Sequence, residues 1–399
     1  MKIRSILILC AISICYAVSW GQTWKLTETM TAKLDKSVFT VSTTKSAEAM
    51  PDYDWVTNPI PWGDNLDEIH SVVIADKVTS VGTWAFRHCA SLTSVTLSNS
   101  VVNIAEFAFY NCYKLPSIKF PESLTTIGPC AFSLCQSLVE IEIPSSVSYI
   151  NSYAFGGCDQ LTSFRVSDNN AYYSTANGVL YDKDKKILMQ YPKKKNDAIF
   201  NIPNTVEIIE SSAFFNASFD SISIPNSVKV IRNEAFKLCF NLTSITIPNS
   251  VTEIADYAFA DCSGLKTVTI VRANPLKLPD STFNKVKTSA ATLRVPTGTT
   301  KAYRDANVWK DFGKFVEFYF DYSNIEPIRR DGACPVSAWT HDGILHITGL
   351  IAGEPLYIYN SLGQLLYHNV SSAEEIQIPY TWRGVAVIVS GKQHLKIVQ

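Results

Sequence analysis

The chain of 399 residues is long enough for two or three domains, and its 46% hydrophobic residues exclude a disordered polymer. Its 35 basic and 36 acidic side chains leave a net charge of −1, so it lacks the positive field that nucleic-acid binding requires. Charged residues make up only 18% of the chain, below the usual share of about a quarter. Serine, threonine and asparagine take their place.

The first 21 residues have the pattern of a secretory signal peptide. Lys2 and Arg4 precede an apolar run over 6–18, and small residues follow it. This run is shorter than the roughly 20 residues that cross a bilayer as a helix, and no later stretch reaches that length. We therefore expect no transmembrane segment, cleavage near Gly21 with Ser19 as the alternative, and an exported protein at the cell surface or outside the cell.

An Ala-Phe dipeptide recurs seven times and defines an internal repeat of about 23 residues. Its phenylalanines are Phe86, Phe109, Phe132, Phe155, Phe214, Phe236 and Phe259. Cysteine follows three residues later in six of the seven units. The longest interval holds an insertion at 167–201, which has the pattern of a hairpin with a charged tip at 182–186. Aspartates alternate with its lysines, which favours a solvated tip over an anion-binding patch.

Each unit combines two hydrophobic periodicities. Ile104, Ala108 and Cys112 have the spacing of one side of a short helical turn. The pattern Leu-x-x-Ile-x-Ile, as at 242–247, alternates like a short strand. A unit of this size cannot bury its apolar side chains alone, so neighbouring units must stack around one continuous core. The sequence therefore predicts a repeat solenoid with a short strand and a helical turn in each 23-residue unit.

The segment 242–262 reads Leu-Thr-Ser-Ile-Thr-Ile-Pro-Asn-Ser-Val-Thr-Glu-Ile-Ala-Asp-Tyr-Ala-Phe-Ala-Asp-Cys and resembles the BspA-like leucine-rich repeat of bacterial surface proteins. The resemblance implies a leucine-rich repeat horseshoe over 69–320, with an N-terminal cap or entry segment at 22–68 and a closing cap at 271–320. It also implies a non-catalytic surface or secreted protein that adheres to host matrix or other proteins.

The repeat ends at residue 320, and 321–339 has the composition of a linker. Six short strands, separated by glycine and asparagine, are predicted at 344–348, 356–359, 364–368, 375–378, 385–390 and 394–398. They indicate a small C-terminal β-sandwich at 340–399. The stretches 358–365 and 384–389 resemble the C-terminal sorting modules of bacterial type IX secretion substrates. Such a module is either a cleaved signal or a retained domain.

Two of the ten cysteines lie in the leader, which leaves eight in an exported chain. We expect stacked helical turns to hold the repeat cysteines farther apart than the roughly 7 Å between α-carbons that a disulfide allows, and we predict buried free thiols. His88 adjoins Cys89, and we expect an exposed imidazole beside a buried thiol.

The sequence contains no C-x-x-C pair, no H-E-x-x-H or G-x-S-x-G motif, no phosphate loop and no dinucleotide fingerprint. We therefore expect no metal, no cofactor, no catalytic residues and no enzymatic activity. An active site assembled from scattered residues is the alternative that motifs do not detect.

The residues on either side of the central apolar position of each repeat strand are expected to line a concave sheet. They form two rows of mainly hydroxyl groups, and four charged residues add a local pattern to them. The predicted binding residues are Ser94, Thr96, Ser117, Lys119, Glu140, Glu142, Ser163, Arg165, Ser221, Ser223, Ser244 and Thr246. Cross-strand pairing that only stabilises the sheet is the other explanation of the four charges.

We interpret the chain as a monomer that binds an extracellular protein or glycan through this face. The alternative is a structural, self-associating component of a surface layer, which would need an apolar end or edge without a cap. The hairpin at 167–201 is a further candidate for the binding region.

Overall fold

The computed structural model describes residues 21–195 and 200–318, together with strands and turns of the C-terminal part. The described C-terminal ranges are 337–341, 344–350, 353–360, 365–370, 375–379, 386–390 and 393–397. The predicted signal peptide, except Gly21, and most of the predicted linker lie outside the described residues. The chain divides into two compact units, residues 1–172 and 173–399, and each is described by itself.

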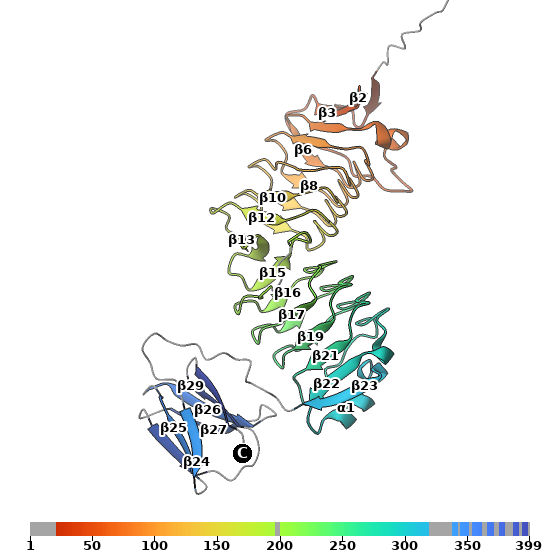
Figure 1. Ribbon diagram of the computed structural model, residues 1–399. Coiled ribbons are helices and arrows are strands. Elements are labelled where there is room, and N and C mark those ends of the chain that lie inside the picture. Colours follow the sequence, from red (N-terminus) through yellow and green to blue (C-terminus); the bar gives the residue numbers. More distant parts are fainter. Residues whose placement is uncertain are drawn as a thin grey trace, which may run out of the picture. The chain divides into compact units, whose positions relative to one another are not determined.

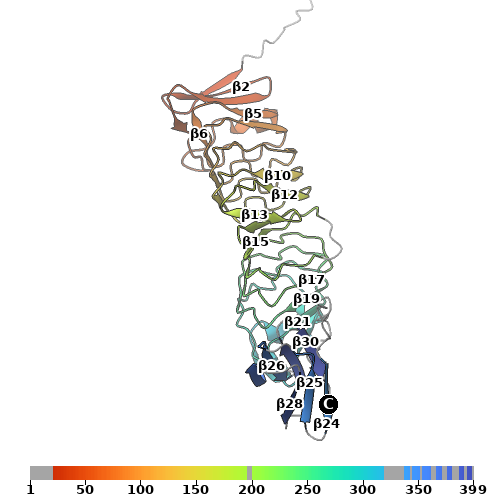
Figure 2. The same cartoon turned by 90° about the vertical axis from the view of Figure 1, so that its left-hand side faces the viewer.

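The first unit is a β-solenoid whose coils stack through two ladders of parallel strands (Figures 1 and 2). One ladder consists of the repeat strands and is in two pieces: β5 (Ser71–Ile74) pairs with β7 (Ser94–Leu97), and β10 (Glu140–Ile143) pairs with β12 (Ser163–Val166) in a separate sheet. The other holds β4 (Glu48–Ala49), β6 (Val78–Val81), β8 (Asn103–Ile104), β9 (Thr126–Ile127) and β11 (Tyr149–Ile150). The second ladder was not predicted, because most of its strands are too short to show an alternation.

An antiparallel meander covers the first coil of this unit. It consists of β1 (Gln22–Lys25), β2 (Met30–Asp35) and β3 (Val38–Thr43), and β3 then pairs in parallel with β5. Trp62, just before the 3-10 helix η1 (Gly63–Glu68), is fully buried. Its ring centroid lies 4.7 Å from that of Phe39, and its Nε1 donates to the Ala85 carbonyl at 2.9 Å. The meander and Trp62 therefore close the end of the core.

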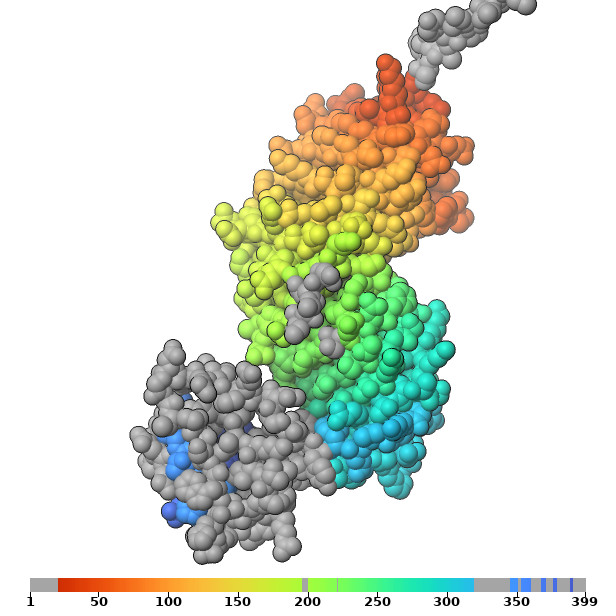
Figure 3. Space-filling view, in the orientation of Figure 1, coloured from red at the N-terminus to blue at the C-terminus, as the bar shows by residue number. Residues whose placement is uncertain are grey.

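The repeat phenylalanines form a stack through the core, which confirms the predicted repeat solenoid. In the first unit Phe86, Phe109, Phe132 and Phe155 lie at successive centroid distances of 5.4, 5.3 and 5.7 Å. In the second unit Phe214, Phe236, Phe259 and Phe283 lie at 5.0, 5.3 and 5.4 Å. Phe283 marks a coil that the Ala-Phe dipeptide missed, because Thr282 precedes it. The coils form successive bands in the space-filling view (Figure 3).

The segments predicted as helical turns are pairs of β-turns. In the first complete coil the Ala85 amide donates to Gly82 and the Cys89 amide donates to Phe86, across four residues each. The third residues of these turns, Trp84 and His88, have φ of 62° and 63°, as a type II turn requires. Two consecutive four-residue turns bring every fourth residue to the same side, as a helix does. The spacing therefore identified the buried side correctly but not the backbone conformation. We call the side of the coils formed by these turns the turn side.

Five buried repeat cysteines each donate a hydrogen bond from the thiol to the coil before it. The acceptors are the repeat phenylalanine carbonyls, in the pairs Cys112–Phe86, Cys135–Phe109, Cys158–Phe132, Cys239–Phe214 and Cys262–Phe236, at 3.0 to 3.3 Å. Backbone hydrogen bonds join the coils, so successive coils lie closer together than packed helices do. The expectation that the distance between coils prevents disulfides was therefore wrong. The seven described cysteines are nevertheless free, and each of these five satisfies a buried carbonyl.

The second unit starts with an antiparallel sheet that leads into a further solenoid. β13 (Tyr173–Ala176) pairs with β14 (Val179–Asp182), and β14 pairs with β15 (Ile187–Gln190). β15 then pairs in parallel with β16 (Ile208–Ile209), followed by β18 (Val230–Ile231) and β20 (Glu253–Ile254). The last strand of the insertion is therefore a member of the solenoid ladder, and the charged tip at 182–186 connects two paired strands.

The repeat strands of the second unit form one ladder that continues into its closing segment. Its members are β17 (Ser221–Ser223), β19 (Ser244–Ile247), β21 (Thr267–Ile270), β22 (Thr292–Pro296) and β23 (Lys314–Phe318). A short helix, α1 (Thr300–Asp305), and two 3-10 turns, η2 (Thr288–Ala290) and η3 (Trp309–Asp311), flank the last two strands. Trp309 is fully buried, and its Nε1 donates to the Leu276 carbonyl at 2.7 Å. This indole closes the core as Trp62 does in the first unit.

The C-terminal strands form two antiparallel sheets. One contains β24 (Ser337–His341), β25 (Ile344–Thr348) and β28 (Glu375–Pro379), and the other contains β26 (Pro355–Asn360), β27 (Leu365–Val370), β29 (Ala386–Ser390) and β30 (Gln393–Ile397). Buried residues of both sheets, such as Leu345 and Ile358, belong to one core cluster. All six predicted strands are present, and β24 begins within the segment 321–339 that we predicted as a linker.

Replacing Phe132 by alanine is expected to remove the contacts of its ring with Phe109 and Phe155 and to leave a cavity in the stack. The free energy of unfolding of the first unit should fall by about 3 to 5 kcal/mol, as measured by urea denaturation of the mature chain. The control is Tyr149→Ala, because Tyr149 is 50% exposed in the same unit, and its effect should stay within about 0.5 kcal/mol. Equal effects of the two substitutions would contradict the stacked core.

The repeat thiols should be free but slow to react in the folded protein. Burial raises the pKa of Cys89, Cys112, Cys135, Cys158 and Cys239, so the reactive thiolate does not form at neutral pH. We expect a chromogenic disulfide reagent to label them only after denaturation, whereas Cys130, which is only half-buried, should react earlier. Disulfides between repeat cysteines in non-reducing mass spectrometry would refute this.

Candidate functional site

The strand face of the first unit carries eight of the predicted binding residues. Ser94, Thr96, Ser117, Lys119, Glu142 and Arg165 are exposed, and Glu140 and Ser163 are half-buried. Ser94 lies opposite Ser71 in the ladder, Glu140 opposite Ser163, and Glu142 opposite Arg165. On β10 and β12 the intervening residues Ile141 and Phe164 are buried, so Glu140, Glu142, Ser163 and Arg165 lie on the outward face of these strands.

The ladder is interrupted in the coil that carries Ser117 and Lys119. Residues 115–120 form no strand, although a strand was expected there. In other coils the amide after the repeat leucine donates to the preceding coil, as Thr162 does to the Val139 carbonyl at 2.9 Å. The equivalent residue here is Pro116, which has no amide hydrogen. Ser117 and Lys119 are therefore presented by an irregular segment between β7 and β10.

The four charged residues divide into a bonded pair and two separate charges. Arg165 Nε lies 2.8 Å from Glu140 Oε1, and the Ser163 hydroxyl donates to the same oxygen at 2.8 Å. This contact joins β10 to β12 across the ladder and stabilises the sheet, as the alternative explanation required. Lys119 and Glu142 have no ion pair with a described residue.

The strand face of the second unit is neutral at its start and basic at its end. Ser223 and Thr246 are exposed and Ser244 is half-buried, while Ser221 is placed by its backbone opposite Ser244. The ladder register continues these rows onto Thr267 and Thr269, then onto Thr292 and Arg294, and finally brings Lys314 opposite Thr292. Arg294 and Lys314 are exposed. Sequence reasoning missed them because it assigned β22 and β23 to a cap, although β22 shows the same alternation as the repeat strands.

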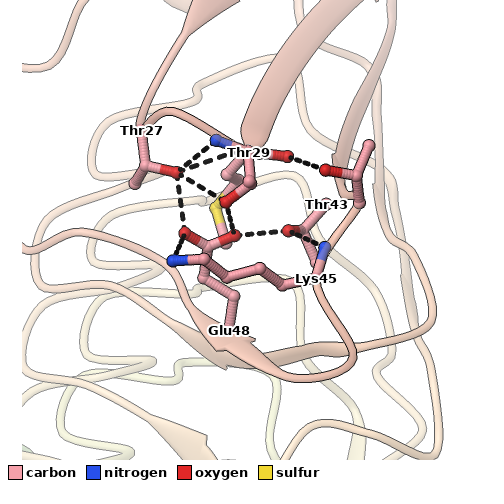
Figure 4. Close-up of polar contacts among 7 residues, drawn as sticks. Thr27, Thr29, Thr43, Lys45 and Glu48 are labelled. Atoms are coloured by element: carbon pink, nitrogen blue, oxygen red, sulfur yellow. Dashed lines mark hydrogen bonds and ion pairs between the residues drawn. The ribbon is translucent and has the colours of Figure 1, made fainter.

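The Glu48 carboxylate lies in a cluster of polar side chains at the start of the first unit (Figure 4). Its oxygens accept hydrogen bonds from Thr43, from Thr27 at 2.7 Å and from Thr29 at 2.9 Å, and Lys45 Nζ lies 3.4 Å away. These contacts, that of Thr43 first, lower the pKa of Glu48 to about 2. A general base needs a pKa nearer to neutrality, so Glu48 serves to fasten β4 to the meander.

No group of three or more histidine, cysteine or acidic side chains in the described part of the chain is arranged to hold a metal ion. Among the helices of the described residues, none is both long and apolar enough to span a membrane.

The chain is similar to known bacterial repeat proteins. Six copies of the BspA type leucine-rich repeat region match it over residues 64–176 and 191–307, more than half of its length. No curated protein matches it.

Several solved structures resemble the chain, among them the following three. A leucine-rich repeat protein from Eubacterium ventriosum is 28% identical, with a TM-score of 0.58, and the match covers 69% of this chain and 78% of that one. The pneumococcal vaccine antigen PcpA is 17% identical, with a TM-score of 0.48 and coverage of 74% and 98%. A leucine-rich cell surface protein from Faecalibacterium prausnitzii is 22% identical, with a TM-score of 0.40 and coverage of 76% and 96%. The first likeness supports the assignment of a repeat solenoid.

Glu48→Gln should change how stability depends on pH. Folding lowers the pKa of Glu48 from 4.5 to about 2, so its contribution is complete above pH 4.5 and is lost as pH falls toward 2. At neutral pH the variant should have a lower melting temperature than the parent chain. The difference in melting temperature should shrink as the pH falls from 4.5 toward 2. Circular dichroism melts at several pH values measure it. Glu142→Gln is the control, and parallel pH profiles for parent and Glu48→Gln would contradict the role.

Proposed function

Because the chain belongs to the family of BspA type leucine-rich repeat proteins, we propose that it is an exported, non-catalytic binding protein whose strand faces hold an extracellular protein or glycan. The N-terminal pattern of a signal peptide supports export. The resemblance of the C-terminal module to type IX sorting modules supports delivery to the cell surface. The family resemblance further favours adhesion to host matrix or mucosal proteins.

The observation that carries this proposal is the presence of two exposed charges on the first strand face that form no ion pair with a described residue. Lys119 and Glu142 are exposed and lack an ion pair with any described residue, and the hydroxyl-bearing Thr96 and Ser117 are exposed on the same face. The flanking strands are fixed by backbone hydrogen bonds, so little conformational entropy is lost when a ligand is bound. Such a surface suits a polar ligand with charges of both signs.

Binding is favoured over self-association because segments outside the repeat cover the core of each unit. Trp62 and the meander cover the first coil, and Trp309 with its flanking segments covers the last coil of the second solenoid. A layer-forming protein would need an apolar end for stacking, and these caps remove it. We therefore propose a monomer.

The test compares two double variants of the mature chain by surface plasmon resonance on a panel of purified matrix and mucosal proteins. Lys119→Ser with Glu142→Ser should weaken binding at least about tenfold to any protein of the panel that binds the parent chain, because each lost charge-assisted hydrogen bond is worth about 1.5 to 3 kcal/mol. This double variant should have the same melting temperature as the parent chain. Glu140→Ser with Arg165→Ser should instead lower stability by at most about 1 kcal/mol.

Undiminished binding by a folded chain with all four charges replaced by serine would contradict the strand-face proposal. Attention would then move to the insertion at 167–201.

A further inference from the structure

A cluster of aromatic rings around one guanidinium lies on the turn side of the first unit. Trp84 and Arg87 come from the double turn of one coil, Phe107 and Tyr110 from the equivalent positions of the next coil, and Trp55 from the loop before η1. The Arg87 Cζ lies 4.4 Å from the ring centroid of Trp55, 4.7 Å from that of Trp84 and 5.5 Å from that of Tyr110. We call these five residues the aromatic platform.

Arg87 has no carboxylate partner among the described residues. Its Nε is buried without a hydrogen bond, although a guanidinium carries five donors and stays charged in proteins. The acidic residues of the adjoining loop are already engaged. Asp52 accepts the Thr83 amide at 2.7 Å, and Asp54 accepts the amides of its own turn. The platform therefore holds a cation that contacts aromatic rings but pairs with no carboxylate of the described residues.

The loop at 54–58 presents apolar side chains to solvent in a fixed conformation. Trp55 is 67% exposed and Val56 is 87% exposed. The Asp54 carboxylate accepts the Val56 amide at 2.6 Å, and the Asp54 amide donates to the Asn58 carbonyl at 2.9 Å, which closes the loop. The ring of Trp55 lies 5.2 Å from that of Trp84. These exposed groups are held in place before any partner arrives, which lowers the entropic cost of binding.

The polar groups beside the platform are already hydrogen-bonded, which argues against a glycan. Asn111 Nδ2 lies 2.9 Å from His88 Nδ1. Burial, and then the charge of Arg87, lowers the pKa of His88, so the neutral ring accepts this hydrogen bond. Asn58 Nδ2 donates to the Asp52 carbonyl at 2.6 Å. A sugar would find few free donors and acceptors for its hydroxyl groups, whereas tryptophan, tyrosine and arginine are the residues that dominate protein interfaces.

We propose that the aromatic platform is a docking site for a protein partner that presents a carboxylate beside an apolar side chain. The carboxylate would pair with the Arg87 guanidinium, and the apolar side chain would pack on Trp55 and Val56. Such a pair is a charge-assisted hydrogen bond held over an aromatic surface. This site uses none of the strand-face residues and stands independently of the function proposed for them.

The experiment selects phage-displayed random 12-residue peptides on the immobilised mature chain. Enriched peptides should contain aspartate or glutamate next to an aromatic or aliphatic residue. The peptide of the strongest clone, made synthetically, is then titrated by calorimetry. Arg87→Gln and Trp55→Ala should each weaken its binding at least about tenfold, and Arg87→Lys should have an intermediate effect because it keeps the charge but not the planar fork.

Two controls make the outcome decisive. Phe240→Ala removes an aromatic residue that is 50% exposed in the second unit, and it should leave the affinity unchanged. Melting curves should show that Arg87→Gln remains folded. The proposal fails if enriched peptides lack acidic residues, if Arg87→Gln binds the peptide as the parent does, or if only the Lys119→Ser/Glu142→Ser variant loses it. Binding of arrayed glycans that depends on Trp55, without peptide binding, would also overturn it.

Discussion

The backbone hydrogen bonds between equivalent positions of successive coils are the constraint on which the solenoids depend. The Phe86 amide donates to the Ala108 carbonyl, the Phe109 amide to Ala131 and the Phe132 amide to Ala154, each at 2.8 Å. These bonds set the distance between coils, and the ring stacking and the thiol contacts follow from that distance. A slip of one residue in any coil would place a polar side chain in the core and break the bonds on both sides.

The same constraint explains why the ladder is interrupted at one coil without loss of the fold. Pro116 removes one amide from the repeat-strand ladder, but the coil keeps its bonds on the turn side and in the second ladder, at β8 and β9. A coil needs only some of its contacts to stay in register, because its neighbours hold it from both sides. Lys119 is therefore presented by a segment that is not part of a paired strand.

Much of the fold was predictable from the sequence, because the core positions of the repeat are periodic and apolar. The turn conformation was not, since φ is positive at Trp84 and His88, which are not glycines and give no sequence signal. Of the candidate sites, the outward strand residues followed from alternation, whereas the Glu140 and Arg165 pairing depends on side-chain positions. The aromatic platform was missed because Trp55 is distant in sequence from Arg87, and no spacing rule connects a loop residue to a repeat.

Different coils carry different residues at the same repeat position, which shows which side chains the fold requires. The positions of Trp84 and Arg87 are occupied by Cys130 and Ser133 two coils later, and both coils keep the double turn and the buried phenylalanine. Small residues at these positions are therefore sufficient for stacking. The large aromatic and cationic side chains of the first coils are half-buried and add a surface that the solenoid does not require. All coils share the same internal geometry, and the residues at such outer positions vary between coils. The repeat can therefore carry separate surfaces on its strand side and its turn side.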